Sequence, residues 1–195
     1  MSLPSQTKFI VGNEACERFS FYGMRSILAL YMTGMLMMTE SEAVEVMHLF
    51  SALIYILPLL GAWIADRFLG RYRTILYISL FYCLGHGVLA LADLTESLEM
   101  RRNILLLGLF IIALGAGGIK PCVSAFVGDQ VDGQPSQVMT RVYAAFYWSI
   151  NLGSFFSFLV IPFIRQTWGY SWAFAIPGIF MAVATFIFWC GRKMY

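Results

Sequence analysis

The stretch "NILLLGLFIIALGAG", residues 103–117, decides the fold class of this chain of 195 residues. Its apolar side chains follow one another without the apolar and polar alternation of a membrane β-barrel strand, so it is typical of a helix in lipid. A helix needs roughly 20 mainly apolar residues to cross about 30 Å of hydrocarbon. The chain is 59% hydrophobic and 12% charged, with a mean hydropathy of +0.73. These values predict an all-α integral membrane protein.

Six apolar runs of membrane-spanning length follow one another along the chain. They cover residues 14–38, 44–65, 74–92, 104–126, 141–164 and 171–191. The loops between them are short and polar, which leaves no room for a second, soluble domain. We therefore expect residues 1–195 to form one bundle of six transmembrane helices. The amino-terminal "MSLPSQTKF" lacks the apolar core and cleavage site of a signal peptide, so the first helix is expected to remain in the mature protein.

Lysine and arginine are distributed unevenly between alternate loops. One side would hold Lys8, Arg67, Arg71, Arg73, Arg141, Arg192 and Lys193, and the other Arg101, Arg102 and Arg165. The richer side is expected to be cytoplasmic, which places both termini inside, and the plasma (inner) membrane is the expected location. The formal net charge of +2 is too small to indicate nucleic-acid binding. The four cysteines lie in apolar runs without the spacing of a metal or redox site.

The first apolar run carries charged residues that a lipid-facing helix would not tolerate. Glu14, Arg18, Tyr22 and Arg25 are four, four and three positions apart and therefore share one stripe of a helix, with Glu17 one step round from it. A charge near the bilayer centre costs about 2.5–3.5 kcal/mol on insertion scales, so the stripe should face protein or water. For Glu14, Glu17 and Arg18 an alternative remains, in which they snorkel to the membrane interface.

A second intramembrane cation, Lys120, follows three glycines and precedes Pro121 in "GAGGIKP". The glycines allow another helix to approach closely, and the proline frees a backbone carbonyl. An ammonium group at this depth requires a counter-charge, and Glu14 and Glu17 are the candidates that the chain offers.

Three further polar residues interrupt apolar helices. His48 and Tyr55 lie seven residues apart and so share a helix face, which leaves either a structural or a proton-sensing role open for His48. His86 has no such companion and is expected in the core. Asn151 is a lone amide in an apolar stretch, where an interhelical hydrogen bond is the ordinary role.

Taken together, these stretches resemble the proton-dependent oligopeptide transporter family of the major facilitator superfamily, specifically its amino-terminal half. Residues 14–23 match the family pattern ExxERFxYYG, with Phe21 where the family usually has its first tyrosine. "GAGGIKPCVSAFVGDQ" (115–130) and "FYWSINLGSF" (146–155) match the signatures of the fourth and fifth helices. Because these motifs occur in the family's order, the resemblance covers essentially the whole chain.

The loop after the second run, "GAWIADRFLGRYRTI" (61–75), resembles the gating motif GxLADRxGRR of the superfamily. Ala62 replaces a usual glycine, and one extra residue separates Arg67 from Gly70. The resemblance implies that Asp66, Arg67 and Arg71 hold helix ends together on the cytoplasmic side until the carrier opens inward. These residues could instead only set the topology.

The resemblance also implies roles for the buried polar residues. Arg25 and Lys120 would receive the carboxylate of a peptide, and Tyr22, Tyr55 and Asn151 would contact the rest of it. Glu14, Glu17, Arg18 and His48 would couple transport to protons. In one workable cycle, a glutamate pairs with Lys120 in the empty site, and its protonation releases the lysine to bind the peptide.

The implied function is proton-coupled symport of di- and tripeptides into the cytoplasm by alternating access, with protons as the coupling ion and no cofactor or metal. Members of the superfamily have two six-helix halves, so the expected partners are the bilayer, the peptide and a carboxy-terminal six-helix half. The isolated chain is not expected to transport. Two alternatives are a nitrate or other anion carrier of the same family and a non-transporting half-fold receptor or scaffold. An enzyme is not expected, because the sequence offers neither a nucleophile paired with a base nor a metal motif such as HExxH.

Overall fold

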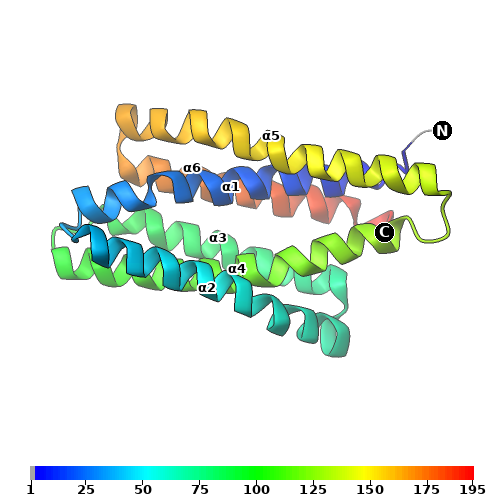
Figure 1. Ribbon diagram of the computed structural model, residues 1–195, viewed down its shortest axis with the longest axis horizontal. Helices are drawn as coiled ribbons and strands as arrows, with labels where there is room; N and C mark the ends of the chain where they lie inside the picture. The colour runs from blue at the N-terminus through cyan, green and yellow to red at the C-terminus, as the bar shows by residue number, and fades with distance from the viewer. Residues whose placement is uncertain (1–2) are drawn as a thin grey trace.

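The computed structural model describes residues 3–195, and within them the chain forms six long helices and no β-strand (Figure 1). The helices are α1 (Thr7–Gly34), α2 (Glu40–Ile64), α3 (Arg71–Ala92), α4 (Leu98–Gln130), α5 (Ser136–Trp168) and α6 (Tyr170–Cys190). A short π-helix, η1 (Ala65–Leu69), extends α2, and one turn of 3-10 helix, η2 (Gly191–Lys193), follows α6. The expected all-α architecture is therefore confirmed.

Five of these helices, α2 with η1 through to α6, are long and apolar enough to cross a bilayer. Helix α1 has 28 residues, which at 1.5 Å per residue is about 42 Å and long enough to span. It differs from the other five because charged residues interrupt its apolar sequence. Three of its charged side chains, Glu14, Glu17 and Arg18, are buried against neighbouring helices.

Local sequence signals account for the boundary between the first two helices. Helix α1 ends at Gly34, four residues before the expected end of the first run, and Met37 takes a left-handed backbone conformation with φ of 53°. Thr39 then begins α2 with a capping box: its hydroxyl accepts from the Glu42 amide at 3.2 Å, and the Glu42 carboxylate accepts from the Thr39 amide at 2.7 Å.

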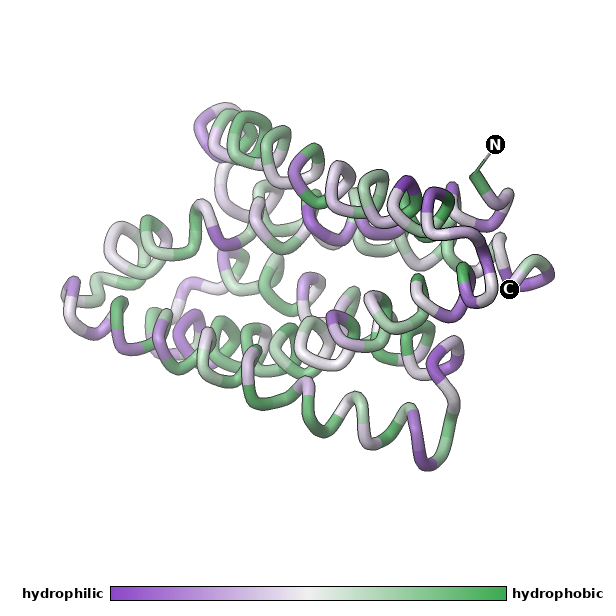
Figure 2. Tube along the Cα trace, turned by 45° about the vertical axis from the view of Figure 1, so that its right-hand side comes forward, coloured by the Kyte–Doolittle hydropathy of each residue, from purple (hydrophilic) through white to green (hydrophobic). Residues whose placement is uncertain are grey.

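The helices form two layers, α1, α5 and α6 in one and α2, α3 and α4 in the other (Figures 1 and 2). Within the layers, α1 packs on α5 and α6, and α4 packs on α2 and α3. Between the layers, α3 packs extensively on α6, whereas α1 meets α2 and α4 at few points. The layers are thus joined along α3 and α6, and α1 and α4 approach each other only locally.

Glycine residues allow the close helix crossings inside each layer. A Cβ atom on Gly153 of α5 would clash with the backbone of Ala15 in α1, and one on Gly61 of α2 would lie 2.5 Å from the Gly118 Cα in α4. Small residues at these crossings let the backbones touch, as is usual for helices that pack within lipid. Both termini lie at the same end of the bundle, together with the α2–α3 and α4–α5 connections (Figure 1).

Candidate functional site

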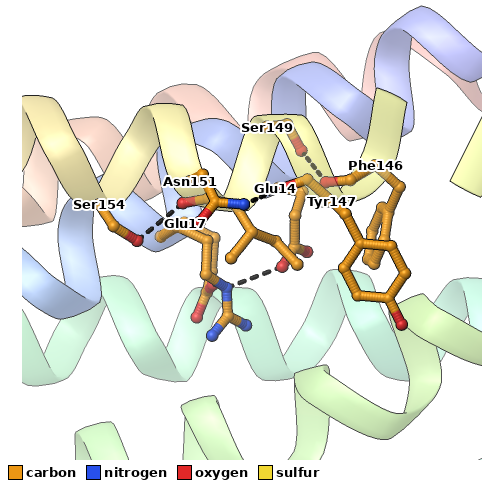
Figure 3. A network of polar contacts seen from close by, with 9 residues as sticks. Glu14, Glu17, Phe146, Tyr147, Ser149, Asn151 and Ser154 are labelled. Atoms are coloured by element: carbon orange, nitrogen blue, oxygen red, sulfur yellow. Dashed lines mark hydrogen bonds and ion pairs between the residues drawn. The ribbon is translucent and has the colours of Figure 1, made fainter. Parts of the chain in front are cut away.

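A triad of charged side chains lies in the amino-terminal half of α1. Glu14, Glu17 and Arg18 are only 3%, 0% and 7% exposed. The Arg18 Nε lies 2.7 Å from a carboxylate oxygen of Glu14 and 2.7 Å from one of Glu17. Figure 3 shows the side chains of Glu14 and Glu17 directed from α1 toward the layer of α2, α3 and α4. Burial among helices rules out the alternative in which these three residues snorkel to the interface.

The charge balance of this triad gives it a chemical property. One guanidinium faces two carboxylates, so the triad carries one unbalanced negative charge when both glutamates are ionised. Protonation of either glutamate would leave a neutral triad. One glutamate–arginine ion pair is kept within the triad in either protonation state.

A second polar cluster supports the triad from α3. Tyr82 and His86 are both 0% exposed, and their rings stack at 5.2 Å between centroids. The His86 Nε2 lies 2.9 Å from the Ser20 hydroxyl of α1, and the Tyr82 hydroxyl faces the Glu17 carboxylate. His86 is thus a core residue, as expected. Tyr82 was not among the residues predicted from the sequence, although its spacing of four from His86 in "YCLGH" was a usable signal.

Lys120 does not pair with a glutamate, contrary to the sequence-based expectation. Its side chain is half-buried on α4, and among residues 3–195 it forms no ion pair with a carboxylate. The Nζ instead lies 4.3 Å from the centroid of the Phe21 ring. The physical reason is competition: Arg18 follows Glu17 directly and Glu14 by one turn, so it holds both carboxylates without bridging between helices.

Two further candidate residues, Arg25 and Tyr22, lie beyond the triad along α1. Arg25 is half-buried and donates a hydrogen bond of 3.3 Å to the Ser51 hydroxyl of α2. Tyr22 is half-buried and packs its ring against Phe158 of α5, with 6.0 Å between centroids. The charged stripe therefore runs from the buried triad to a half-exposed cation.

The polar residues expected on α2 and α5 are exposed. His48 is exposed, and Tyr55 is 81% exposed. Asn151 is also exposed, and its side-chain amide donates to the Tyr147 carbonyl of its own helix at 2.9 Å (Figure 3). The interhelical hydrogen bond considered for Asn151 is therefore not formed. All three side chains remain accessible to a ligand or to a packing partner.

The gating motif forms a charged cluster at the end of the bundle that holds the termini. Arg71, at the start of α3, forms an ion pair with Asp129 in the last turn of α4 and lies 4.0 Å from Asp66 in η1. Arg67 is exposed. Asp129 was not among the residues predicted from the sequence. An acidic residue in the last turn of a helix opposes the helix dipole, and this signal could have indicated a cationic partner.

Two apolar grooves lie outside this polar region. A groove of about 240 Å³ between α2, α3 and α4 is lined by side chains such as Leu57, Ile78 and Phe81. Another of about 330 Å³ between α1, α5 and α6 is lined by Phe19, Phe156 and neighbours. Neither offers a charged anchor. Across residues 3–195 no cluster of three or more His, Cys, Asp or Glu side chains could hold a metal ion.

Comparisons with known proteins point to one family. Residues 72–195 match the family model described as "PTR2: POT family". The whole chain is 46% identical to mouse "Solute carrier family 15 member 2", of which it covers 28%. It is 44% identical over 98% of its length to Caenorhabditis elegans "Peptide transporter family 2", of which it covers 25%. The crystal structure of the POT family transporter PepTSo superposes with a TM-score of 0.89 and 46% identity, over 100% of this chain and 39% of that one. The chain thus spans less than a third of the length of these curated relatives.

Proposed function

The chain belongs to the POT family of transporters, and from that membership we propose that it forms the amino-terminal six-helix half of a proton-coupled symporter of di- and tripeptides. In this proposal residues 1–195 act as one unit of a major facilitator fold. Helix α1 spans the membrane together with the five apolar helices α2 to α6. Both termini of the chain face the cytoplasm, and the membrane is the plasma (inner) membrane. Protons are the coupling ion, and no cofactor takes part. A carboxy-terminal six-helix half would complete the transporter.

The observation that carries this proposal is the placement of three cations along the α1–α4 contact. Arg18 is neutralised by two glutamates, whereas Lys120 rests on an aromatic ring and Arg25 on a neutral hydroxyl. Lys120 and Arg25 thus keep an uncompensated positive charge in a half-buried setting. A peptide carboxylate is a suitable ligand for such a pair, because charge-assisted hydrogen bonds are strongest where water is excluded.

The remaining site residues then take roles that fit their exposure. Tyr22, Tyr55 and Asn151 would contact the peptide backbone and side chains. His48, exposed on α2, would take part in proton transfer with Glu14, Glu17 and Arg18. A second half facing α2 and α5 would supply the group that binds the peptide's amino terminus.

The structure changes the coupling scheme from the one that the sequence suggested. Protonation of Glu14 or Glu17 would not release Lys120 from an ion pair, because that pair is not formed. It would instead remove the unbalanced negative charge of the triad, which repels an incoming carboxylate. The proton thereby becomes a condition for substrate binding through the local potential.

The energy available supports accumulation of a peptide. One proton that enters down about 100 mV and one pH unit releases roughly 2.3 plus 1.4 kcal/mol. This corresponds to an accumulation of several hundred-fold for a neutral dipeptide. Asp66, Arg67 and Arg71, with Asp129 as a further member, would hold the cytoplasmic ends of α2, α3 and α4 together between openings.

Uptake of a labelled dipeptide into proteoliposomes tests the proposal. The complete reading frame that encodes this chain is reconstituted with an acid-outside gradient, and wild type is compared with Lys120→Ala. We expect gradient-driven accumulation in wild type and its loss in the variant. Lys193→Ala is the matched control, because Lys193 is exposed in η2, away from the site. Accumulation of nitrate instead of any dipeptide would favour the anion-carrier alternative, and binding without flux would favour a receptor.

A further inference from the structure

Phe21 occupies the point where the two helix layers touch. Its side chain is 2% exposed, and its ring stacks near Phe50 of α2 with 6.3 Å between centroids. Lys120 of α4 places its Nζ 4.3 Å from the centre of the same ring. One side chain of α1 therefore contacts α2 and α4, the helices that α1 otherwise meets at few points.

The contact with Lys120 is electrostatic in origin. The face of an aromatic ring carries partial negative charge, and an ammonium group within about 6 Å of its centroid is attracted to it, more strongly where water is excluded. The attraction differs from an ion pair because the ring does not neutralise the lysine. It fixes the position of the ammonium and leaves its full charge available to an anion.

The charged residues around Lys120 explain why a contact with a ring differs in effect from an ion pair. Glu17 and Glu14 are the acidic groups that act on Lys120, and Arg18 and Arg25 are the basic ones. Both glutamates are held by Arg18. If the ring did not hold Lys120, the ammonium would be drawn toward the triad, which carries an unbalanced negative charge while both glutamates are ionised. An ammonium paired there would be unavailable to a substrate carboxylate.

We propose that Phe21 is a positioning residue that holds the Lys120 ammonium on its ring face, away from Glu14 and Glu17, so that an anionic carboxylate can bind it. The part that concerns a peptide carboxylate rests on the proposed function. The position of Lys120 on the ring does not. Phe21 itself touches no substrate in this proposal and acts only through Lys120.

A magnetic resonance experiment tests the position of Lys120 without any substrate. Lysines of the complete reading frame are labelled as ¹³C-dimethyl derivatives, which keep their charge, and the Lys120 signal is identified by its loss in Lys120→Arg. Because the group lies over a ring face, its methyl protons should be shifted upfield by the ring current. We expect the shift to persist in Phe21→Tyr, which keeps the ring, and to vanish in Phe21→Leu. An unchanged signal in Phe21→Leu would overturn the inference.

Peptide binding tests the consequence. Replacement of Phe21 by pentafluorophenylalanine nearly keeps the ring shape and reverses the partial charge of its face to positive, so a mere packing role would leave binding unchanged. We expect the affinity for a dipeptide to fall about tenfold, which is about 1.4 kcal/mol, and the affinity for its carboxy-terminal amide to stay within twofold. Equal or higher affinity for the dipeptide would contradict the proposal.

The two measurements separate the inference from the function on which it partly rests. If the wild-type protein binds neither the dipeptide nor the amide, the proposed peptide function fails, and the resonance of Lys120 still decides whether Phe21 positions it. If the dipeptide binds and the ring-current shift is absent, the function stands and the role of Phe21 is refuted. Gel filtration of each variant in detergent confirms that it is folded.

Discussion

Removal of the Arg18 guanidinium should destabilise the protein more than removal of any surface cation. Arg18→Met keeps the length of the side chain and leaves Glu14 and Glu17, which are 3% and 0% exposed, without their shared counter-charge. Removing one partner of a buried pair typically costs about 3–5 kcal/mol, because the other charge stays buried and uncompensated. For a domain of this size each kcal/mol lowers the unfolding midpoint by about 2–4 °C, so we expect a decrease of about 6–20 °C.

Thermal unfolding in detergent, followed by gel filtration after heating, measures this decrease. The matched control is Arg73→Met, which removes an exposed arginine from α3. Because the cost comes from uncompensated carboxylates, the added substitutions Glu14→Gln and Glu17→Gln should restore most of the lost midpoint to the Arg18→Met protein. A midpoint for Arg18→Met within about 2 °C of wild type would refute the buried-triad reasoning, as would a failure of the two glutamines to restore it.

Three further outcomes are expected. Gly153→Val should prevent α1 and α5 from packing, since a Cβ there meets the Ala15 backbone, and the yield of monodisperse protein should fall sharply. Gly87→Val, at an exposed helical position of α3 with open space around it, would show whether valine alone lowers the yield. Asp129→Asn should remove the Arg71–Asp129 ion pair between α3 and α4 and so increase the labelling of a cysteine introduced nearby. The double exchange Arg71→Asp with Asp129→Arg should restore the ion pair and reverse the increase. Unchanged labelling in Asp129→Asn would show that this ion pair does not hold the helix ends together. Ser20→Ala should lower the unfolding free energy by about 1–3 kcal/mol, because His86 loses its buried hydrogen bond, and a denaturation midpoint equal to wild type would contradict that role.

Much of the fold could be predicted from the sequence because lipid imposes strong local constraints. In a bilayer every backbone group must bond within its own segment, so apolar runs of sufficient length become helices. The run 104–126 lies within α4, and the run 171–191 lies within α6 except for Gly191, which begins η2. The helix ends were less predictable: Gly34 ends α1 early, and α4 and α5 extend about one turn or more beyond the apolar runs at each end.

The members of the site could also be found in the sequence, since a charge in an apolar helix is expensive and therefore conspicuous. Glu14, Glu17, Arg18, Arg25 and Lys120 were all selected on that ground. Asp129 and Tyr82 escaped selection, because Asp129 lies at a helix end where charges are common and Tyr82 is ordinary in an apolar helix. Only their partners in space, Arg71 and Glu17, make them part of the charged network.

The sequence by itself determined a helical membrane bundle and the residue types of its polar site. The tertiary structure decided which charges pair: the glutamates with Arg18 of their own helix, and Lys120 with the face of Phe21. The physical reason is that the cost of a buried charge depends on its own residue and can be read from the sequence. The interaction energy that offsets this cost falls steeply with the distance between the two groups and depends on their orientation. For groups on different helices, only the packing of those helices sets the distance and the orientation.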